Sequence, residues 1–401
     1  MFGRLKPTIV LSKEHQLFGA VLAADWAVGA MRTWDPALFR DIDWSRIPNL
    51  AWQHKVRPLL AAALREAGWP AGSIGIKLPI EAAERECSLK TMAQLTLLSA
   101  LAAAARKQQV RVLALKGVAL SLRLYGNPFV REAFDLDVCV HPDDTARFQA
   151  VLEAAGCVPA SDEPPLTPRQ AGILARFHHH RTFRHPGSGI IVESHYALDR
   201  NPHLLATDFD ALWRNRAEVS LGQTAMPTLG DEDLVYYVGI HAARHCWERW
   251  KWTGDLSALY RTLDDAQLLR VRERARRDGN QHLFDAGILL TAAITGRTAP
   301  GDLAGRAAEN RRARALADHA IRYSTRHVTP ESVAGHHYVA SHLAYYLRLK
   351  SSPRYLAYEF LAMLHHEGDW HRLRLPDRLI WLYYLLRPMT YFQRRAKDLR
   401  R

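Results

Sequence analysis

Apolar residues recur at three- and four-residue spacing along the first quarter of the chain, from about Leu11 to Gln109. The stretches HQLFGAVLAADWAVGAMR and EAAERECSLKTMAQLTLLSALAAAARKQQ show this spacing and are rich in alanine, the residue with the highest helix propensity. The loop WPAGSIGIKLP, with its prolines and glycines, separates them. The pattern predicts an N-terminal helical region over residues 1–108.

The pattern changes at Val110, where short apolar runs replace the helical spacing. VRVLAL is short and partly β-branched, and it predicts a buried strand that ends before Gly117. VALSLRLYG predicts a short helix with Gly126 as its C-terminal stop, and FDLDVCV predicts a second strand. HPDDTARFQAVLEAAG opens with proline and aspartate and ends in glycine, which predicts another helix.

The segment ARFHHHRTFRHPGSGIIVESHYAL predicts a β-hairpin with its turn at Pro186–Gly189. Such a turn would place Glu193 opposite Arg181 or Thr182. After Leu198 the helical spacing returns, and we expect it to continue to the end of the chain.

These elements predict an α+β fold with a small mixed-sheet core between two helical regions. We place the core at residues 109–200 and the C-terminal helical region at residues 201–401. The length of 401 residues suits two or three structural units.

The composition of the chain gives it a net positive charge. The chain is 48% hydrophobic and 24% charged, which is ordinary for a globular protein with a sizeable core. Its formal net charge of +13 favours a polyanionic partner, such as a nucleotide, a nucleic acid or an anionic lipid, without choosing among them.

The four cysteines, at positions 87, 139, 157 and 246, have no CxxC spacing and indicate free thiols in a reducing compartment. The N-terminus lacks the pattern of a signal peptide, and no uncharged run reaches the roughly 20 residues that span a bilayer. We therefore expect a cytoplasmic protein without a transmembrane segment.

Two aspartates separated by one residue lie in the second predicted strand. Successive strand residues alternate faces, so Asp135 and Asp137 project together. Carboxylates this close repel each other unless a cation lies between them, and Mg²⁺ is the ion that most often joins one or two carboxylates to phosphates. A bare DxD also occurs by chance at sheet edges and helix caps, so the neighbouring residues decide its meaning.

Those neighbours favour a metal and nucleotide site. Lys116-Gly117 stands where a strand gives way to a helix, and there glycine and helix N-terminal amides suit close approach of phosphate. Glu193 is a charge within the apolar run IIVESH, which is costly unless the carboxylate is paired, exposed or bound to a metal. A third carboxylate would complete a two-metal cluster.

The spacing resembles that of the polymerase-β-like nucleotidyltransferase superfamily, and more closely a group of uncharacterised bacterial nucleotidyltransferases. That group carries LKG…L…Y…R…DxD…V, which is matched here by Leu115, Lys116, Gly117, Leu120, Tyr125, Arg131, Asp135, Asp137 and Val140.

Two later motifs extend the resemblance. The group's hairpin carries an ELHW-like motif, of which this chain keeps Glu193 and His195 but has Ser194 and Tyr196 in place of leucine and tryptophan. A helical HxxxHxW…W…D block is matched by His241, His245, Trp247, Trp252 and Asp255.

The resemblance implies a nucleotidyltransferase core that uses Mg²⁺ or Mn²⁺ to move a nucleoside monophosphate from an NTP to a hydroxyl or phosphate acceptor, with release of pyrophosphate. Asp135, Asp137 and Glu193 would hold the metals, and Glu193 would also serve the acceptor. Lys116 and Gly117 would hold the β- and γ-phosphates, with Arg131 as a further phosphate contact or, instead, one half of an ion pair. The wider superfamily has Gly-Ser where this chain has Lys-Gly, so the phosphate contacts differ from the superfamily's pattern.

Other polar residues near these motifs are candidate contacts for the acceptor or for phosphate: Arg181, His195, His241, His245, Lys251 and Asp255. The hairpin register would bring His195 near His179 or His180. The run HHH at 178–180 and the i, i+4 histidine pair both admit three readings: a zinc site, a ligand contact, or ordinary packing.

The acceptor stays open among a small molecule, a peptide or protein, and RNA. A non-catalytic nucleotide- or RNA-binding module with a degenerate transferase fold is one alternative, and a transferase that uses a sugar-nucleotide donor is another. The aromatic and basic tail RLPDRLIWLYYLLRPMTYFQRRAKDLRR is compatible with a helix on a membrane surface or with a core helix.

Overall fold

A seven-stranded mixed sheet lies at the centre of the computed structural model, which describes residues 10–161, 166–326, 345–365, 367–373, 375–387 and 389. The strand order is β3-β4-β5-β2-β1-β7-β6, with helices on both faces, so the predicted α+β class is confirmed. The strands are β1 (Val112–Ala114), β2 (Asp135–Val140), β3 (Val158–Pro159), β4 (His180–Arg184), β5 (Ile191–His195), β6 (Ala217–Ser220) and β7 (Ala225–Thr228).

The side chains of strand β2 alternate between an apolar face and a face that carries the two aspartates. Leu136, Val138 and Val140 are buried in an apolar cluster with residues of the long helix α4 (Lys77–Lys107) and of α6 (Thr145–Ala154). Asp135 and Asp137 alternate with them and so point to the opposite face. Apolar burial on one side thus fixes the strand register that places the two carboxylates on the other side.

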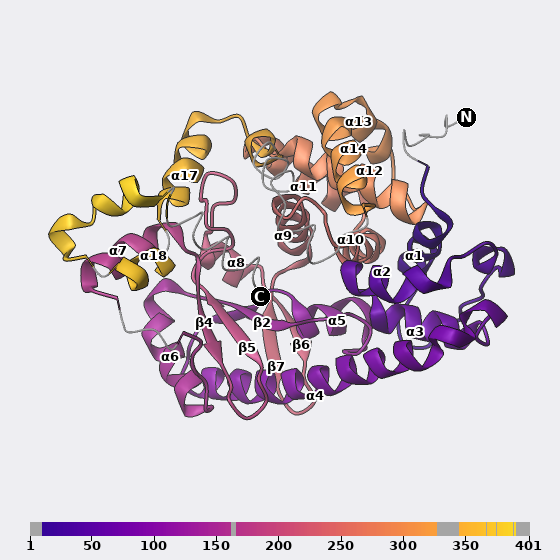
Figure 1. Cartoon of the computed structure of the whole chain (residues 1–401), viewed down its shortest axis with the longest axis horizontal. Helices are drawn as coiled ribbons and strands as arrows, with labels where there is room; N and C mark the ends of the chain where they lie inside the picture. Colours follow the sequence, from indigo (N-terminus) through magenta and orange to yellow (C-terminus); the bar gives the residue numbers. More distant parts are fainter. Residues whose placement is uncertain are drawn as a thin grey trace.

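Helices α4 and α6 pack on one face of the sheet, and most of the other helices lie over its other face and beyond its ends (Figure 1). Residues 71–107 are long and apolar enough to cross a membrane by length and composition alone, which is weak evidence because core helices meet the same criterion. The other helices are α1 (Lys13–Ala23), α2 (Ile47–His54), α3 (Arg57–Glu66), α5 (Gly117–Tyr125), α7 (Pro168–Phe177), α8 (Phe209–Arg214), α9 (Asp231–Arg244), α10 (Lys251–Thr262), α11 (Asp265–Arg277), α12 (Gln281–Thr295), α13 (Leu303–Glu309), α14 (Arg311–Ser324), α17 (Pro353–Leu364) and α18 (Glu367–Leu373).

The predicted hairpin is confirmed in its turn and in its register. Strands β4 and β5 are antiparallel, with Thr182 opposite Glu193 and His180 opposite His195. Strand β5 also pairs in parallel with β2, where Glu193 is the partner of Asp137. The third acidic residue therefore lies beside the DxD pair on the same face of the sheet.

The expectation of continuous helix after Leu198 is wrong for residues 217–228, which form the hairpin β6–β7. Each strand has only four residues, and Pro227 weakens the strand signal. Pairing of Thr228 with Ala114 of β1 adds the hairpin to the sheet, and this long-range contact leaves no local pattern. The division of the chain at residues 108 and 200 stays a prediction. Half of the aromatic and basic tail, namely residues 374, 388 and 390–401, lies outside the described residues.

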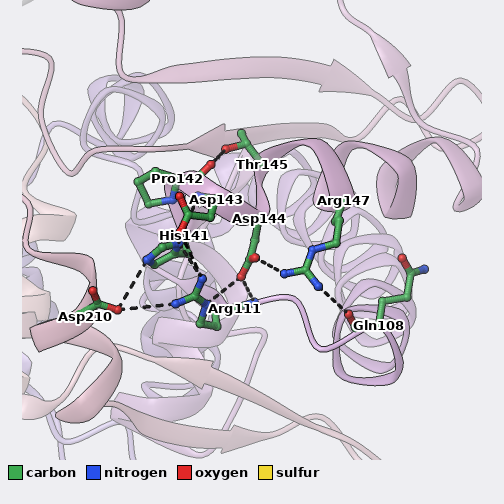
Figure 2. Close-up of polar contacts among 9 residues, drawn as sticks. All are labelled: Gln108, Arg111, His141, Pro142, Asp143, Asp144, Thr145, Arg147 and Asp210. Carbon is green, nitrogen blue, oxygen red and sulfur yellow. Dashed lines mark hydrogen bonds and ion pairs between the residues drawn. The ribbon is translucent and has the colours of Figure 1, made fainter.

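A buried carboxylate joins the start of β1 to the far end of β2. Asp144, at the end of the short helix η4 (Pro142–Asp144), accepts hydrogen bonds from the Arg111 backbone N at 3.0 Å and from Arg111 Nε at 2.9 Å, and it also pairs with Arg147 (Figure 2). The Arg111 guanidinium and the His141 ring also contact Asp210, near the start of α8. These contacts fix the two strands at the end opposite to the DxD pair.

Candidate active site

Three carboxylates line one cavity of about 420 Å³ on the face of the sheet that lies toward α9 and α10. Asp135, Asp137 and Glu193 are supplied by the parallel strands β2 and β5, and Asp137 is only 4% exposed. A larger hollow of about 1100 Å³ beside α4 contains none of these carboxylates. The rest of the site cavity is formed by Lys55, Lys116, Gly117, Arg131, Ala133, Phe134, His241, His245, Arg249, Lys251 and Trp252.

The Lys-Gly turn brings the backbone close to the DxD strand. Gly117 begins α5 with φ of +69°, a conformation that side-chain-bearing residues rarely adopt. A Cβ atom at this position would lie 3.2 Å from the Asp135 carbonyl oxygen and 3.7 Å from Ala133 Cβ. Glycine is therefore required here both for its backbone conformation and for the close approach to β2.

Lys116 and His195 stabilise the negative charge of Asp137. Lys116 Nζ lies 3.1 Å from Asp137 Oδ1 and 3.5 Å from His241 Nε2, and His195 Nε2 lies 3.2 Å from Asp137 Oδ1. Burial alone would raise the pKa of Asp137, but the Lys116 charge and the His195 hydrogen bond outweigh it and hold that pKa well below its ordinary value. Asp137 is thus ionised. Lys116 and His195 occupy the positions beside its carboxylate where a metal cation would bind.

Asp135 and Glu193 respond differently to the same surroundings. Burial, and next the charge of Asp137, raise the pKa of Asp135. The pKa of Glu193 is lowered chiefly by its hydrogen bond to His195, whose Nε2 lies 3.3 Å from Glu193 Oε2. Against the effect of burial, these two carboxylate contacts, to Asp137 and Glu193, raise the pKa of His195.

The opposite wall comes from the end of α9 and the start of α10. His241 and His245 pack there with tilted rings at 4.7 Å between ring centroids, and Trp252 packs against both. Lys251 Nζ donates to the Glu132 carbonyl oxygen at 3.3 Å. Burial, and next the charge of Arg131, lower the pKa of Lys251 to about 7. The wall therefore offers nitrogen donors to a ligand that enters from the carboxylate side.

Three of the predicted contacts, His195, Asp255 and Arg181, do not line the cavity. His195 is buried against Asp137 and Glu193. Asp255 is buried and holds Arg131 through two hydrogen bonds to Nε, at 2.9 and 3.0 Å. Arg131 itself lines the cavity, so Asp255 positions it and does not face the ligand space. Arg181 is exposed on the other face of β4, because it pairs with Ser194 and not with Glu193, and it donates to Gln149.

The structure adds cationic residues that the sequence did not indicate. Lys55, directly after α2, lies 4.4 Å from the centroid of the Phe134 ring, just before the DxD pair. Burial lowers the pKa of Lys55 to about 8. Arg249, between α9 and α10, also lines the cavity. Lys55 is 80 positions from Asp135 with no motif around it, so folding alone brings the two together.

The carboxylates fit a divalent cation. Ligand atoms of Asp137, Glu193 and His195 all lie within 4.8 Å of one another, and Asp135 lines the same cavity. Carboxylate oxygens are the donors that Mg²⁺ and Mn²⁺ prefer. Lys116 now neutralises the most buried of them and would have to move away from Asp137 when a cation binds.

The family comparison covers this site. A family described as uncharacterised nucleotidyltransferases matches residues 40–296, a range that includes every candidate site residue. The chain belongs to this family. No curated protein matches it. This nucleotidyltransferase is therefore an enzyme, a transferase of phosphorus-containing groups, with a nucleotide as substrate.

Proposed function

We propose that this nucleotidyltransferase moves a nucleoside monophosphate from an NTP to a hydroxyl or phosphate acceptor, with Mg²⁺ or Mn²⁺ held by Asp135, Asp137 and Glu193. One observation carries the proposal: three carboxylates face one cavity whose other walls bear five cationic side chains. A cavity lined only by carboxylates would repel a triphosphate. A cavity lined only by cationic side chains would bind a triphosphate without a metal ion. The combination suits a metal-bound triphosphate. The cations are Lys55, Lys116, Arg131, Arg249 and Lys251.

The proposed roles follow from position. When bound, the metal ions would lower the pKa of the acceptor hydroxyl and neutralise charge on the leaving pyrophosphate. Lys116, at the start of α5, exchanges its contact with Asp137 for one with the β- or γ-phosphate. Arg131, fixed by Asp255, contacts a second phosphate oxygen.

The bond changes in this proposal are those of direct displacement. An acceptor oxygen forms a bond to the α-phosphorus, and the bond from that phosphorus to the bridging oxygen of pyrophosphate breaks. Glu193, at the margin of the cavity, takes the acceptor proton or passes it to water. His195 holds Glu193 in place through its hydrogen bond.

The relation to the polymerase-β-like superfamily is part of the same proposal. The order β1, Lys-Gly turn, α5 and DxD strand, with a third acidic residue on the neighbouring strand β5, supports it. A cytoplasmic location is also proposed, and four buried cysteines without disulfides support it.

Transfer of label from α-labelled NTPs tests the function. The chain is incubated with each NTP, Mg²⁺ and panels of sugar phosphates, peptides and RNA, and labelled products and pyrophosphate are measured. We expect Asp135→Ala and Asp137→Ala to lower the rate by at least about 1000-fold, since each removes charge stabilisation at the reacting phosphate. Asp302→Ala, at an exposed aspartate, serves as the control.

Unchanged turnover in either carboxylate variant would rule out the assignment of these residues. Nucleotide binding without pyrophosphate release from any NTP and any panel would instead favour the non-catalytic binding module. Transfer of the sugar from a labelled sugar nucleotide, with NTPs inert, would favour the third reading.

A further inference from the structure

A cluster of three imidazole rings lies beside the carboxylates. His180, at the start of β4, pairs in register with His195 at the end of β5, and His179 directly precedes the strand. The ring centroids are 4.6 Å apart for His179 and His180, 5.1 Å for His179 and His195, and 5.0 Å for His180 and His195. Ligand nitrogens of the three rings all lie within 4.8 Å of one another.

Two nitrogens in this cluster are buried without a hydrogen-bond partner. His195 is 3% exposed, and its Nε2 contacts Asp137 and Glu193, but its Nδ1 has no partner among the described residues. His180 Nδ1 is in the same situation. A buried polar atom left unpaired costs about 1–3 kcal/mol, so two of them in neighbouring rings require an explanation.

A bound transition metal explains both nitrogens. Neutral imidazole, which has one ring nitrogen with a free lone pair, is the form that binds metal. A set of nitrogen donors selects Zn²⁺ and related ions over Mg²⁺, which prefers oxygen. Three histidines with a fourth position left for water or substrate is a known zinc arrangement.

We propose that His179, His180 and His195 form a second metal site, for Zn²⁺ or a related transition ion, next to the carboxylate site. His195 joins the two sites: Nδ1 binds the transition ion, while Nε2 donates its hydrogen to Asp137 and Glu193. Metal-binding histidines commonly donate the other ring N–H to a carboxylate in this way. The ion would fix the orientation of His195 and leave the carboxylate oxygens to Mg²⁺.

This site goes beyond the proposed transfer reaction, and its test uses no nucleotide. The full chain is stripped of metal with a chelator and titrated with Zn²⁺ in excess Mg²⁺, with a chromophoric chelator as competitor. We expect one tightly bound Zn²⁺. Affinity should fall by at least about 100-fold in His179→Gln and His180→Gln, since even groups that only hydrogen-bond to a metal ligand contribute about 10- to 100-fold.

Two control variants separate this site from its neighbours. His178→Gln alters the histidine next to the cluster, and Asp135→Asn alters the carboxylate site; both should keep the Zn²⁺ affinity of the native chain. Equal Zn²⁺ affinity in the native chain and both glutamine variants would overturn the proposal. So would loss of Zn²⁺ binding in Asp135→Asn or in His178→Gln, because the ion would then involve the carboxylate Asp135 or the histidine outside the cluster.

X-ray absorption at the zinc edge of the native chain gives a second test that needs no variant. A first shell dominated by imidazole nitrogen supports the site, and a shell of carboxylate oxygen contradicts it. Failure of either test leaves the proposed transfer reaction standing, because Asp135, Asp137 and the cations of the cavity do not depend on this ion.

Discussion

At the scale of single residues, the carboxylates of the site are paired with basic side chains from other elements. Asp137 is almost fully buried, yet Lys116 and His195 hold it ionised from either side. Removing either Lys116 or His195 would leave a buried carboxylate without enough compensation, which is costly. The three residues therefore act as one unit, and in the proposed function a metal ion replaces Lys116 beside Asp137.

Gly117, the first residue of α5, allows this helix to lie close to the strand that carries Asp137. We expect Gly117→Ala to lower the free energy of unfolding by about 1–3 kcal/mol, because alanine would be strained at φ of +69° and its Cβ would press on the Asp135 carbonyl oxygen. Denaturant unfolding measures the change. Gly172→Ala, at an exposed position inside α7 with open space around it, is the matched control and should be neutral or stabilising. Equal effects at the two glycines would contradict the proposed role of Gly117.

At the scale of elements, the carboxylate strand is held at its far end by Asp144. Against the effect of burial, hydrogen bonds from Arg111 lower the pKa of Asp144 to about 2, from an ordinary value of 3.8. A carboxylate whose pKa is lower in the folded chain stabilises the fold above its ordinary pKa, and this contribution is lost as the pH falls toward the folded value. The contact should therefore be at full strength at neutral pH and weaken between about pH 4 and pH 2.

We expect Asp144→Asn to destabilise the chain by about 2 kcal/mol or more at pH 7, since it weakens charge-assisted hydrogen bonds to two arginines. The difference from the native chain should shrink as the pH is lowered below 4. Denaturant unfolding at a series of pH values measures it, with Asp143→Asn, whose side chain is 81% exposed, as the control. A difference that is constant across this range would contradict the pKa shift.

The elements differ in how far the sequence predicts them. The strand, turn, helix and strand from Val112 to Val140 follow from apolar runs and two glycines, and the β4–β5 register follows from the turn at Pro186–Gly189. The hairpin β6–β7 is missed because its strands are short and its support comes from β1. Lys55 is missed for the same reason, since only the packed fold brings it to the cavity. Local sequence patterns predict which residues lie on one strand, whereas long-range packing decides which residues from other elements face that strand.

At the scale of the whole molecule, the helices after the sheet supply the wall opposite the carboxylates and are fixed by buried ion pairs. Glu359 of α17 is 3% exposed and accepts from Arg244 of α9 at 2.6 Å and from Arg200 at 2.6 Å, while Asn201 Nδ2 donates to it at 2.9 Å. Arg244 closes the helix that carries His241. The position of α17 is thereby coupled to the wall of the site.

We expect Glu359→Ala to destabilise the chain by about 3–5 kcal/mol, because it leaves the buried Arg244 with longer contacts, at 3.8 Å to Asp199 and at 3.4 Å to the Tyr355 hydroxyl. Thermal and denaturant unfolding measure the loss. Glu309→Ala, at an exposed glutamate near the end of α13, is the control and should change stability little. A loss no larger than that of the control would show that α17 is not held by this pair.

The formal charge of +13 fits the same picture at long range, because a basic molecule attracts a triphosphate before the site engages it. The proposal of a divalent ion, however, rests on the local arrangement of the site alone. The proposed function therefore depends on one property of the cavity: nucleotide and metal should bind together, through the carboxylates.

Equilibrium dialysis of labelled, non-transferable NTP analogues measures this property without knowledge of the acceptor. Affinity is determined with and without Mg²⁺ for the native chain, Asp135→Asn and Asp137→Asn. We predict that Mg²⁺ strengthens binding of at least one analogue to the native chain by about 10-fold or more, and that this gain falls to about 1 in both variants, because the ion has lost its carboxylate ligands. The same Mg²⁺ gain in the native chain and both variants, or no gain in the native chain with any analogue, would contradict a metal-dependent nucleotide site at Asp135 and Asp137.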